Sequence, residues 1–378
     1  MRICLLGPTH PFRGGISHYT TLLYRHLIKR HEALFVSFVR QYPKWLFPGK
    51  TDIDPSQSQI QEPGVLRILD SMNPYTWFKT AQSIIKFKPD LVIIPWWVSF
   101  WAPQFWTISF LIQLFTNSKI LFLCHNVVEH ESKWIDKLLT RLVLSKADFF
   151  IVHSKEDQEN LEVIIPIAVI KKTYHPTYDV FNMSDYDSEK IRSRYDIKGN
   201  ILLFFGFVRE YKGLKYLLKA IPDILNDLDV TLLVVGEFWK DKDQYLSLIS
   251  TLGIEKNVII VDEYVPNEEV GDYFCAADLV IQPYTSATGS GVVQTAFGFN
   301  KPVIATKVGC LPEVIEHAKT GFLVEPQNIN EIVVTVNKFF NQTDKARMKE
   351  NIIKGNYRFS WEKLIGVIEK LSLKEHKI

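Results

Sequence analysis

Residues 201–214 read Ile-Leu-Leu-Phe-Phe-Gly-Phe-Val-Arg-Glu-Tyr-Lys-Gly-Leu. The apolar run at its start predicts a buried strand over 201–205, and the spacing of the apolar residues that follow predicts a helix over 213–225. Between them lies a loop with two cations, Arg209 and Lys212. Such a strand-loop-helix turn is where doubly wound sheets bind anionic ligands, and two cations can clamp a diphosphate. A solvated basic turn is the plainer alternative.

The same alternation of short apolar runs and helical segments covers most of the chain, which predicts an α/β protein with two doubly wound parallel sheets. Strands are expected over 2–6, 33–38, 90–94, 119–124 and 148–152 in the first half, and over 201–205, 231–235, 258–261, 279–282, 302–305 and 321–324 in the second. Helices are expected over 16–29, 213–225, 267–276 and 292–297. The predicted domains are 1–182 and 200–358, with a polar linker over 183–199 and an amphipathic C-terminal helix within 359–378.

Composition narrows the class of protein. The 378 residues are 47% hydrophobic, and 44 Lys and Arg against 42 Asp and Glu give a net charge of +2, which argues against a nucleic-acid partner. The four cysteines form no CxxC pair, so we expect reduced core thiols. The apolar run before Gly7 is too short for a signal peptide, and we therefore expect a cytoplasmic protein.

Two further loops follow predicted strands. Gly14 and Gly15 lie just before the first helix, where adjacent glycines let backbone N–H groups approach an anion or a sugar, although a plain tight turn is the alternative. Their spacing does not match GxGxxG, which disfavours a dinucleotide. A small, hydroxyl-rich loop at 284–292 precedes another helix and can form an anion nest. We expect this loop and the Arg209–Lys212 loop to converge on one phosphate group.

His125 ends the predicted strand 119–124, at the edge of the sheet where ligands bind. Its expected role is a hydrogen bond to a bound ligand, the alternative being a histidine satisfied by local backbone. Four Asp-x-Asp pairs, at 52/54, 185/187, 227/229 and 241/243, follow no apolar strand. Each is interpreted as a solvated turn, so no metal site is predicted.

Taken together, the motifs over 206–214, 235–236, 276–278, 301–306, 309–313 and 320–324 make the second half resemble the nucleotide-binding domain of retaining family 4 glycosyltransferases (glycosyl transferases group 1) of the GT-B fold. Gly14–Gly15–Ile16, the Cys-His-Asn end of the strand at 119–124 and 147–154 resemble the family's first domain. The resemblance implies two Rossmann-like domains facing across a cleft, an acceptor-binding first domain and a C-terminal helix that crosses back to it.

The resemblance also implies residue roles. Lys212 and His125 match the family's catalytic positions, and Arg209, displaced from the family's arginine position, is expected to serve the same anion as Lys212 in catalysis. Donor-binding positions are matched by Gly14, Gly15, Gly206, Gly236, Tyr264, Val265, Thr288, Gly289, Ser290, Gly291, Val292 and Thr295. The implied reaction moves a hexose-type sugar from a nucleoside-diphosphate donor, UDP in preference to GDP, to a glycan or lipid-linked saccharide. It proceeds with retention, without a metal and without any other cofactor.

Two departures from the family pattern matter. The arginine lies three residues before Lys212 instead of five, and the family's Glu-x7-Glu signature has no glutamate here, its positions falling near Thr288 and Thr295. Two other classes therefore stay open. One is a sugar-nucleotide 2-epimerase of the same fold, which would need acid and base carboxylates that the sequence does not reveal. The other is a non-catalytic nucleotide-sugar-binding scaffold.

The segment 91–118 carries no charge and contains four tryptophans, but Pro95 and Pro103 interrupt it, which argues against a membrane-spanning helix. Core packing explains most of residues 95–115. An apolar acceptor surface, or a peripheral contact with the inner membrane face through tryptophans at headgroup level, is the alternative.

Overall fold

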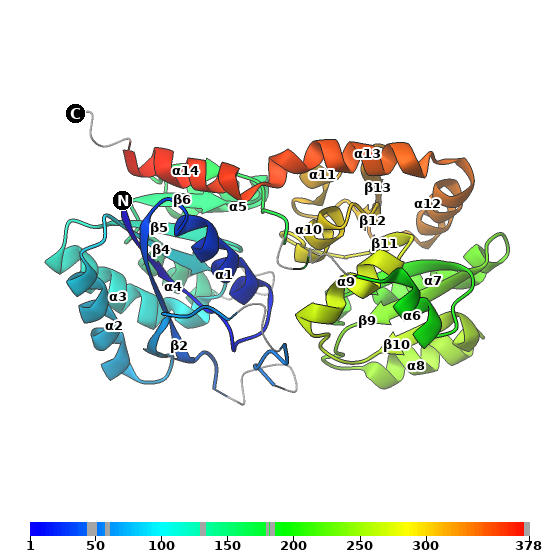
Figure 1. Ribbon diagram of the computed structural model, residues 1–378, viewed down its shortest axis with the longest axis horizontal. Coiled ribbons are helices and arrows are strands. Elements are labelled where there is room, and N and C mark those ends of the chain that lie inside the picture. The colour runs from blue at the N-terminus through cyan, green and yellow to red at the C-terminus, as the bar shows by residue number, and fades with distance from the viewer. Residues whose placement is uncertain (44–50, 57–60, 129–133, 179–180, 182–185, 374–378) are drawn as a thin grey trace. The chain divides into compact units, whose positions relative to one another are not determined.

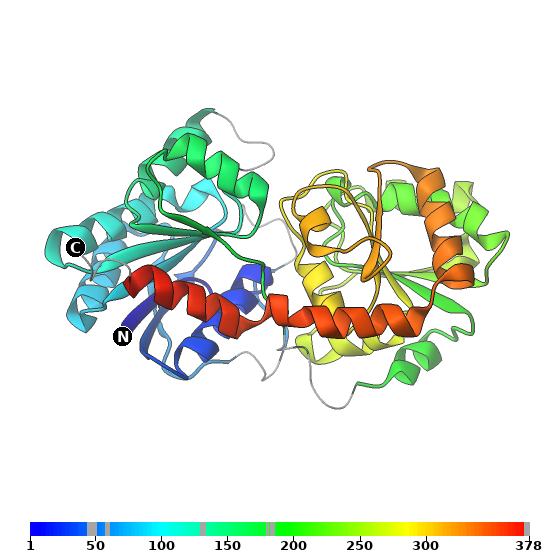
Figure 2. The same ribbon diagram turned by 90° about the horizontal axis from the view of Figure 1, so that it is seen from above.

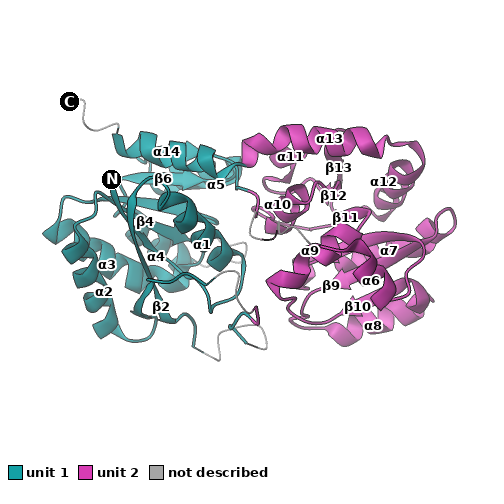
Figure 3. Cartoon of the chain, in the orientation of Figure 1, with its two compact units in different colours: residues 1–54, 60–176, 360–378 teal, residues 55–59, 177–359 magenta. Residues whose placement is uncertain are grey.

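The computed structural model describes residues 1–43, 51–56, 61–128, 134–178, 181 and 186–373. The chain forms two compact units (Figure 3). Unit 1 comprises residues 1–54, 60–176 and 360–378, and unit 2 comprises residues 55–59 and 177–359. Each unit contains one parallel sheet with helices on both faces, so the predicted α/β architecture is confirmed.

Unit 1 contains a seven-stranded parallel sheet in the order β3-β2-β1-β4-β5-β6-β7 (Figure 1). Its strands are β1 (Arg2–Leu6), β2 (Glu32–Arg40), β3 (Leu66–Asp70), β4 (Leu91–Trp96), β5 (Lys119–Cys124), β6 (Phe149–Val152) and β7 (Ile170–Lys172). Its helices are α1 (Gly15–Leu27), α2 (Pro74–Phe87), the 3-10 turn η1 (Ser99–Trp101), α3 (Ala102–Phe115), α4 (Trp134–Leu144), α5 (Lys155–Ile164) and α14 (Trp361–Leu373). The strand order reverses direction between β1 and β4. In sheets of this kind, ligands bind at the carboxyl ends of the strands where the order reverses.

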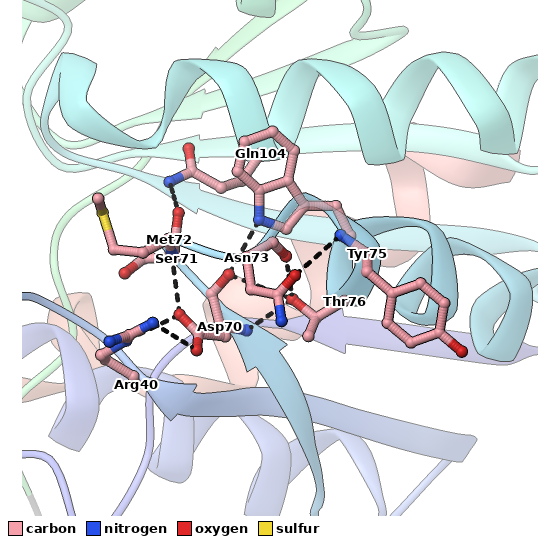
Figure 4. Close-up of polar contacts among 9 residues, drawn as sticks. Arg40, Asp70, Ser71, Met72, Asn73, Tyr75, Thr76 and Gln104 are labelled. Atoms are coloured by element: carbon pink, nitrogen blue, oxygen red, sulfur yellow. Dashed lines mark hydrogen bonds and ion pairs between the residues drawn. The ribbon is translucent and has the colours of Figure 1, made fainter.

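The sequence did not predict β3, the edge strand that polar contacts fix in place (Figure 4). The guanidinium of Arg40, at the end of β2, donates to both carboxylate oxygens of Asp70 over 2.9 and 2.7 Å. The side chain of Asn73 accepts from the backbone N–H of Tyr75 and so caps α2, and Gln104 donates to the carbonyl of Ser71. These bonds join β2, β3, α2 and α3 at one corner of the sheet.

Unit 2 contains a six-stranded parallel sheet in the order β10-β9-β8-β11-β12-β13. Its strands are β8 (Asn200–Phe205), β9 (Val230–Val235), β10 (Val258–Val261), β11 (Leu279–Gln282), β12 (Val303–Thr306) and β13 (Gly321–Val324). Its helices are α6 (Ser188–Arg194), η3 (Glu210–Lys212), α7 (Leu214–Leu225), α8 (Lys242–Thr251), η4 (Glu255–Asn257), α9 (Asn267–Ala276), α10 (Gly291–Gly298), α11 (Leu311–Val314), α12 (Ile329–Gln342), α13 (Lys345–Gly355) and η5 (Asn356–Phe359). The order reverses between β8 and β11, so the two predicted loops follow the two strands at the switch point.

The chain passes from unit 1 to unit 2 after Pro176, and not within the segment 183–199 that was expected to be a linker. The described part of that segment holds α6, which belongs to unit 2 because its cations pair with acids there. Lys190 Nζ lies 2.5 Å from Asp272 Oδ2, and Arg192 Nη2 lies 3.2 Å from Asp278 Oδ2. The segment is therefore largely part of the unit 2 surface.

The C-terminal helix α14 belongs to unit 1, as expected, and lies along α1 (Figures 1 and 2). It buries five large side chains, namely Trp361, Leu364, Ile365, Ile368 and Leu371. Trp361 packs on Tyr19 of α1, with ring centroids 5.1 Å apart, and Glu369 pairs with His31 over 3.1 Å. Helix α14 thus completes the hydrophobic core of unit 1.

The tryptophan-rich segment divides between the core and the surface. Trp96 and Trp101 are buried, together with Phe105, whereas Trp106 is 37% exposed on the outer side of α3. Within the described ranges, no helix combines the length and the apolar character needed to cross a bilayer.

Candidate functional site

The candidate site in unit 2 begins with two glycines at the ends of neighbouring strands. Gly206 follows β8 with φ +98°, and Gly236 follows β9 with φ +144°. A Cβ at Gly236 would collide with the carbonyl group of Gly206. A Cβ at Gly206 would lie 3.3 Å from Nζ of Lys212 and 3.4 Å from Cγ2 of Val292. Glycine is therefore required here so that backbone, lysine and the start of α10 can come together.

A chain of hydrogen bonds joins the two predicted anion-binding loops. Lys212 Nζ donates to the hydroxyl of Tyr284 over 3.2 Å, and this hydroxyl lies 3.1 Å from Oγ of Ser290. Ser290 caps α10, since its Oγ accepts from the backbone N–H of Val293. The structure thus brings the cation of one loop to the helix N-terminus of the other.

Burial changes the proton affinity of this chain. It lowers the pKa of Lys212, an effect that the nearby Arg209 reinforces and Tyr211 opposes. Burial also raises the pKa of Tyr284, although its hydrogen bond with Ser290 acts in the other direction. The phenol therefore stays protonated and can hold the ammonium group and the serine hydroxyl at once.

Arg209 lies on the same loop, where its guanidinium carbon is 3.7 Å from the centroid of the Trp239 ring. A cation held over an aromatic face has a fixed position and keeps its N–H groups at the rim for an anion. Trp239 could not be predicted from the sequence, because it follows β9 without any recognisable spacing to Arg209.

The loop before α10 places its glycines at the surface and uses part of its hydroxyls internally. Gly289 and Gly291 are exposed, but Thr295 is buried and its Oγ1 donates to the carbonyl of Gly291 over 2.9 Å. The carbonyl of Thr288 accepts from the backbone N–H of Cys310 over 3.0 Å. Thr295 therefore stabilises the first turn of α10.

Tyr264 and Val265 lie between β10 and α9, on the far side of β9 from the Lys212 loop. Val265 is buried and Tyr264 is partly exposed. The structure brings them to the same sheet edge as Gly206 and Gly236, and their contact with a base stays a prediction.

The predicted residues of unit 1 lie in the turn before α1 and at the end of β5. Gly14 has φ +112° and precedes the first residue of α1, Gly15. His125 follows β5, and its backbone N–H donates to the carbonyl of Trp96 at the end of β4. Its ring atom Nε2 is buried and forms no hydrogen bond with any residue that the structure describes. A neutral imidazole with a free nitrogen can still bind a ligand hydroxyl.

Three histidines end three neighbouring strands and surround Tyr19. His125, His153 and His175 follow β5, β6 and β7, and the ring centroids of successive pairs lie 5.6 Å (His125 and His153) and 5.1 Å (His153 and His175) apart. Tyr19 meets His125 edge-on at 4.5 Å, and its hydroxyl lies 3.2 Å from His153 Nε2. His153 Nδ1 lies 2.9 Å from the carbonyl of Thr173. Because only N–H can donate to that carbonyl, His153 Nε2 accepts from Tyr19.

Burial lowers the pKa of all three histidines. It lowers the pKa of His153 to about 4, although the bond to Thr173 opposes the shift, and that of His175 to about 3, with a further contribution from His153. The pKa of His125 is well below its usual value because of burial and the two neighbouring histidines. The cluster is therefore uncharged at neutral pH.

The interpretation of the Asp52/Asp54 pair as a solvated turn is wrong. Asp54 of the Asp52/Asp54 pair is not solvated but buried, and its Oδ2 lies 3.4 Å from Nε2 of His18. The segment is drawn inward because Arg13 donates its backbone N–H to the carbonyl of Asp52, and Asp54 donates its own to that of Pro11. In the described part of the chain, no group of three or more His, Cys, Asp or Glu could hold a metal ion.

Part of the chain is similar in sequence to known proteins. Residues 187–357 match the family described as glycosyl transferases group 1. The D-inositol 3-phosphate glycosyltransferase 1 of Catenulispora acidiphila is 30% identical over 195 residues, covering 48% of this chain and 46% of that protein. Spore coat protein SA of Bacillus subtilis is 27% identical over 213 residues, covering 53% and 56%. The chain spans about half the length of these curated relatives.

Solved structures match over nearly the whole chain. HepE from Anabaena, in complex with UDP, has a TM-score of 0.73 at 21% identity and covers 98% of this chain and 100% of its own. Sucrose-phosphate synthase from Thermosynechococcus elongatus has a TM-score of 0.71 at 18% identity and covers 98% of each chain.

Two parallel Rossmann-like sheets and these neighbours define the fold as GT-B. Within it, residues 187–357 are similar to the glycosyl transferases group 1 family.

Proposed function

We propose that the protein is a glycosyltransferase. It moves a hexose-type sugar from a nucleoside-diphosphate sugar to a hydroxyl of a glycan or lipid-linked saccharide, at the cytoplasmic face of a membrane. Transfer retains the anomeric configuration and needs no metal. The observation that carries this proposal is the hydrogen-bond chain from Lys212 through Tyr284 to Ser290, which joins a cation to a helix N-terminus at the switch point of the sheet.

The chemistry follows from these groups. A sugar leaves a nucleoside diphosphate when the charge that develops on the diphosphate oxygen is stabilised. Lys212 supplies a partly buried ammonium group, and Arg209 supplies a second cation, which is fixed on Trp239. The first turn of α10 supplies backbone N–H groups that have no partner inside the helix. The two cations, Lys212 and Arg209, stabilise the leaving diphosphate as a metal ion does in other reactions with a diphosphate leaving group.

His125 is proposed to contact the transferred sugar. Because its imidazole is neutral at pH 7, it can donate or accept a hydrogen bond with a sugar hydroxyl without attracting the diphosphate. Tyr19 fixes the ring by edge-on packing, so the histidine loses little freedom on binding.

The absent glutamate pair favours one rival function, a scaffold that binds a nucleotide sugar without turnover. Thr295 lies near one of those two positions, and its hydroxyl donates a hydrogen bond within α10. The sugar contacts of that position are then made by other groups or not at all. Transfer of the sugar to an acceptor would identify a transferase. Conversion of the donor without acceptor would identify an epimerase, and binding of the donor without turnover for any of several acceptors would identify a scaffold.

Nucleotide binding is the first experiment. UDP is tested first because HepE, a protein of the same fold, was solved with it. We expect UDP to raise the melting temperature more than GDP or ADP does. The shift should be the same with and without EDTA. A ligand at about 100 times its Kd adds about 2.7 kcal/mol to the free energy of unfolding, so the shift should be measurable. No shift with any nucleotide would contradict the donor site.

Replacing Lys212 by Ala then tests the mechanism. We expect turnover to fall roughly 100-fold or more, the scale of losing one charge-stabilising donor. Lys215→Ala is the matched control, because Lys215 lies on the adjacent helix and pairs with the exposed Glu210 over 3.3 Å. Its turnover should stay within about 2-fold of wild type. A Lys212→Ala variant of near-normal rate would remove this lysine from the mechanism.

A further inference from the structure

A groove of unit 2 lies between helices α12 and α13. The two helices follow β13, the edge strand of the sheet, and run in different directions on either side of Thr343 and Asp344 (Figure 2). The groove has a volume of about 640 Å³, within the range of about 300–1,000 Å³ that is usual for small-molecule sites. Its lining includes two buried side chains, Phe322 of β13 and Met348 of α13. We call this space the α12–α13 groove.

The groove lies at the opposite edge of the unit 2 sheet from the two anion-binding loops. Lys319 and Thr320, which line the groove, come immediately before β13 and therefore lie at its amino end. The loops of Lys212 and Ser290 follow the carboxyl ends of β8 and β11. The six strands are parallel, so their amino ends share one edge of the sheet and their carboxyl ends share the other. A ligand in the groove would therefore not occupy the place of a nucleotide at those loops.

Four cations line the groove, namely Lys319, Lys338, Arg347 and Lys354. Lys354 pairs with Glu350 over 2.6 Å, whereas Lys319 lies 3.8 Å from Glu316. Lys338 and Arg347 are exposed, and neither forms an ion pair with a residue that the structure describes. One belongs to α12 and the other to α13, so an anion in the groove meets a cation from each helix.

The two acids of the described lining already have partners. Oε1 of Glu316 lies 3.0 Å from Nη1 of Arg358, a residue outside the lining. Asp344 caps α13, because its Oδ1 accepts from the backbone N–H of Arg347 over 2.9 Å. The groove therefore has an excess of positive charge, which favours an anionic ligand.

Uncharged polar side chains of the lining can bind the rest of such a ligand. Gln342 is exposed at the end of α12, and its amide can both donate and accept. Asn351 donates from Nδ2 to the carbonyl of Lys319 over 3.2 Å, and its Oδ1 can accept from a hydroxyl group. The aromatic ring of Phe322 is only 2% exposed, so it offers no face on which a nucleobase could stack. These groups favour a body that carries hydroxyl groups.

We propose that the α12–α13 groove binds a phosphorylated sugar at a site separate from that of the nucleotide. Lys338 and Arg347 bind its phosphate, since a phosphomonoester carries a charge of about −1.5 to −2 at pH 7 and forms strong hydrogen bonds with cations. Gln342 and Asn351 bind its hydroxyl groups. This site does not depend on the proposed transfer reaction.

Equilibrium dialysis of the full chain against phosphate-bearing probes tests the proposal. The probes are inorganic phosphate, glucose and three hexose phosphates, namely glucose 1-phosphate, glucose 6-phosphate and mannose 6-phosphate. We expect at least one hexose phosphate to bind at least about 10-fold more tightly than inorganic phosphate, because its hydroxyl groups add hydrogen bonds. Glucose should bind more weakly than either, because it carries no charge. Excess UDP should leave the binding unchanged, because the groove and the anion-binding loops lie at opposite edges of the sheet.

Two single variants test the cations of the groove. Lys338→Ala and Arg347→Ala should each weaken the binding of the hexose phosphate at least about 10-fold, the scale of one lost hydrogen bond to a charged group. Lys349→Ala is the matched control and should bind as wild type does. Lys349 is exposed on α13 only two residues from Arg347, but it does not line the groove. All three variants change exposed side chains, so circular dichroism and the melting shift with UDP should match wild type.

Four results would overturn the proposal. The first is no binding of inorganic phosphate or of any hexose phosphate, and the second is binding of the hexose phosphates no tighter than that of inorganic phosphate. The third is binding that both Lys338→Ala and Arg347→Ala retain. The fourth is loss of binding in excess UDP, which would place the probes at the nucleotide loops.

Two further measurements separate this proposal from its neighbours. Vesicles of phosphatidic acid present a phosphomonoester on a lipid. If Arg347→Ala abolished co-sedimentation with these vesicles while no soluble probe bound, the groove would be a lipid headgroup site and the proposal would be wrong. If UDP failed to bind while a hexose phosphate still bound in the groove, the proposed function would be contradicted and the groove site would stand.

Discussion

The histidines around Tyr19 show how a single buried group affects stability. His153 keeps a pKa of about 4 in the folded chain, against an ordinary value of 6.5. Between these values the unfolded chain binds protons that the folded histidine does not. The free energy of unfolding therefore rises with pH through this window and falls as the pH is lowered.

We expect the wild type to lose about 2–3 kcal/mol through His153 when the pH falls from about 7 to about 4.5. His153→Asn removes this titration, so its pH dependence should be shallower by a similar amount. Urea unfolding followed at several pH values measures the difference. Between about pH 7 and 9 His153 titrates in neither the folded nor the unfolded chain. In this range the free energies of unfolding of the wild type and of His153→Asn should differ by a constant. Parallel curves over the acid range would contradict the prediction.

Gly213 illustrates a backbone requirement at the start of α7. Its φ is +69°, and a Cβ would collide with the carbonyl of Pro283. Gly213→Ala should lower the melting temperature by an amount equivalent to roughly 1–3 kcal/mol. Gly366, inside α14 with nothing near a Cβ, is the matched control, where alanine should stabilise by about 0.5–1 kcal/mol. Equal effects at both positions would show that the conformation of Gly213 is not required.

Some site residues could be predicted from the sequence and others could not, for a physical reason. Arg209 and Lys212 share one loop between a strand and a helix, so their neighbours in the sequence define their position. Tyr284, by contrast, acts through its hydroxyl at the end of a distant strand, and no spacing relates it to Lys212. His153 and His175 join His125 only because β5, β6 and β7 are neighbours, an order that a sequence does not state.

At the scale of elements, burial decided which strands could be predicted. All six strands of unit 2 were expected, and most of their residues are buried, so they form continuous apolar runs. The two strands that were not expected are the edges of the unit 1 sheet. Strand β3 is only half buried, and β7 has three residues, of which two are exposed lysines. A half-buried edge strand has no long apolar run to reveal it.

Helix α14 offers a test of packing in unit 1. Ile368 is fully buried, and Ile368→Ala should lower the free energy of unfolding by about 2–5 kcal/mol. Leu373 lies in the same helix but is 59% exposed, so Leu373→Ala should cost less than about 0.5 kcal/mol. Thermal melts compare the two. If both variants melted alike, α14 would not be part of the unit 1 core.

At the scale of the whole molecule, the two units differ in continuity. Unit 2 is formed almost entirely by residues 177–359, whereas unit 1 needs residues 360–378 in addition to its first 176. We expect a fragment of residues 177–359 to fold and bind UDP, and a fragment of residues 1–176 to fold poorly. Circular dichroism and proton-nitrogen spectra measure this. Adding a peptide of residues 360–378 should restore the second fragment, and a well-folded 1–176 alone would contradict the expectation.

The place of α14 in the unit 1 core has a consequence for biosynthesis. During translation, residues 177–359 emerge from the ribosome before the helix that closes the core of unit 1 has been made. The apolar side of α1, which includes Tyr19, stays exposed to solvent during that time. Although most of unit 1 is synthesised first, unit 1 is the last to become complete. Nascent chains that stall late in translation are therefore the ones that chaperones would have to protect.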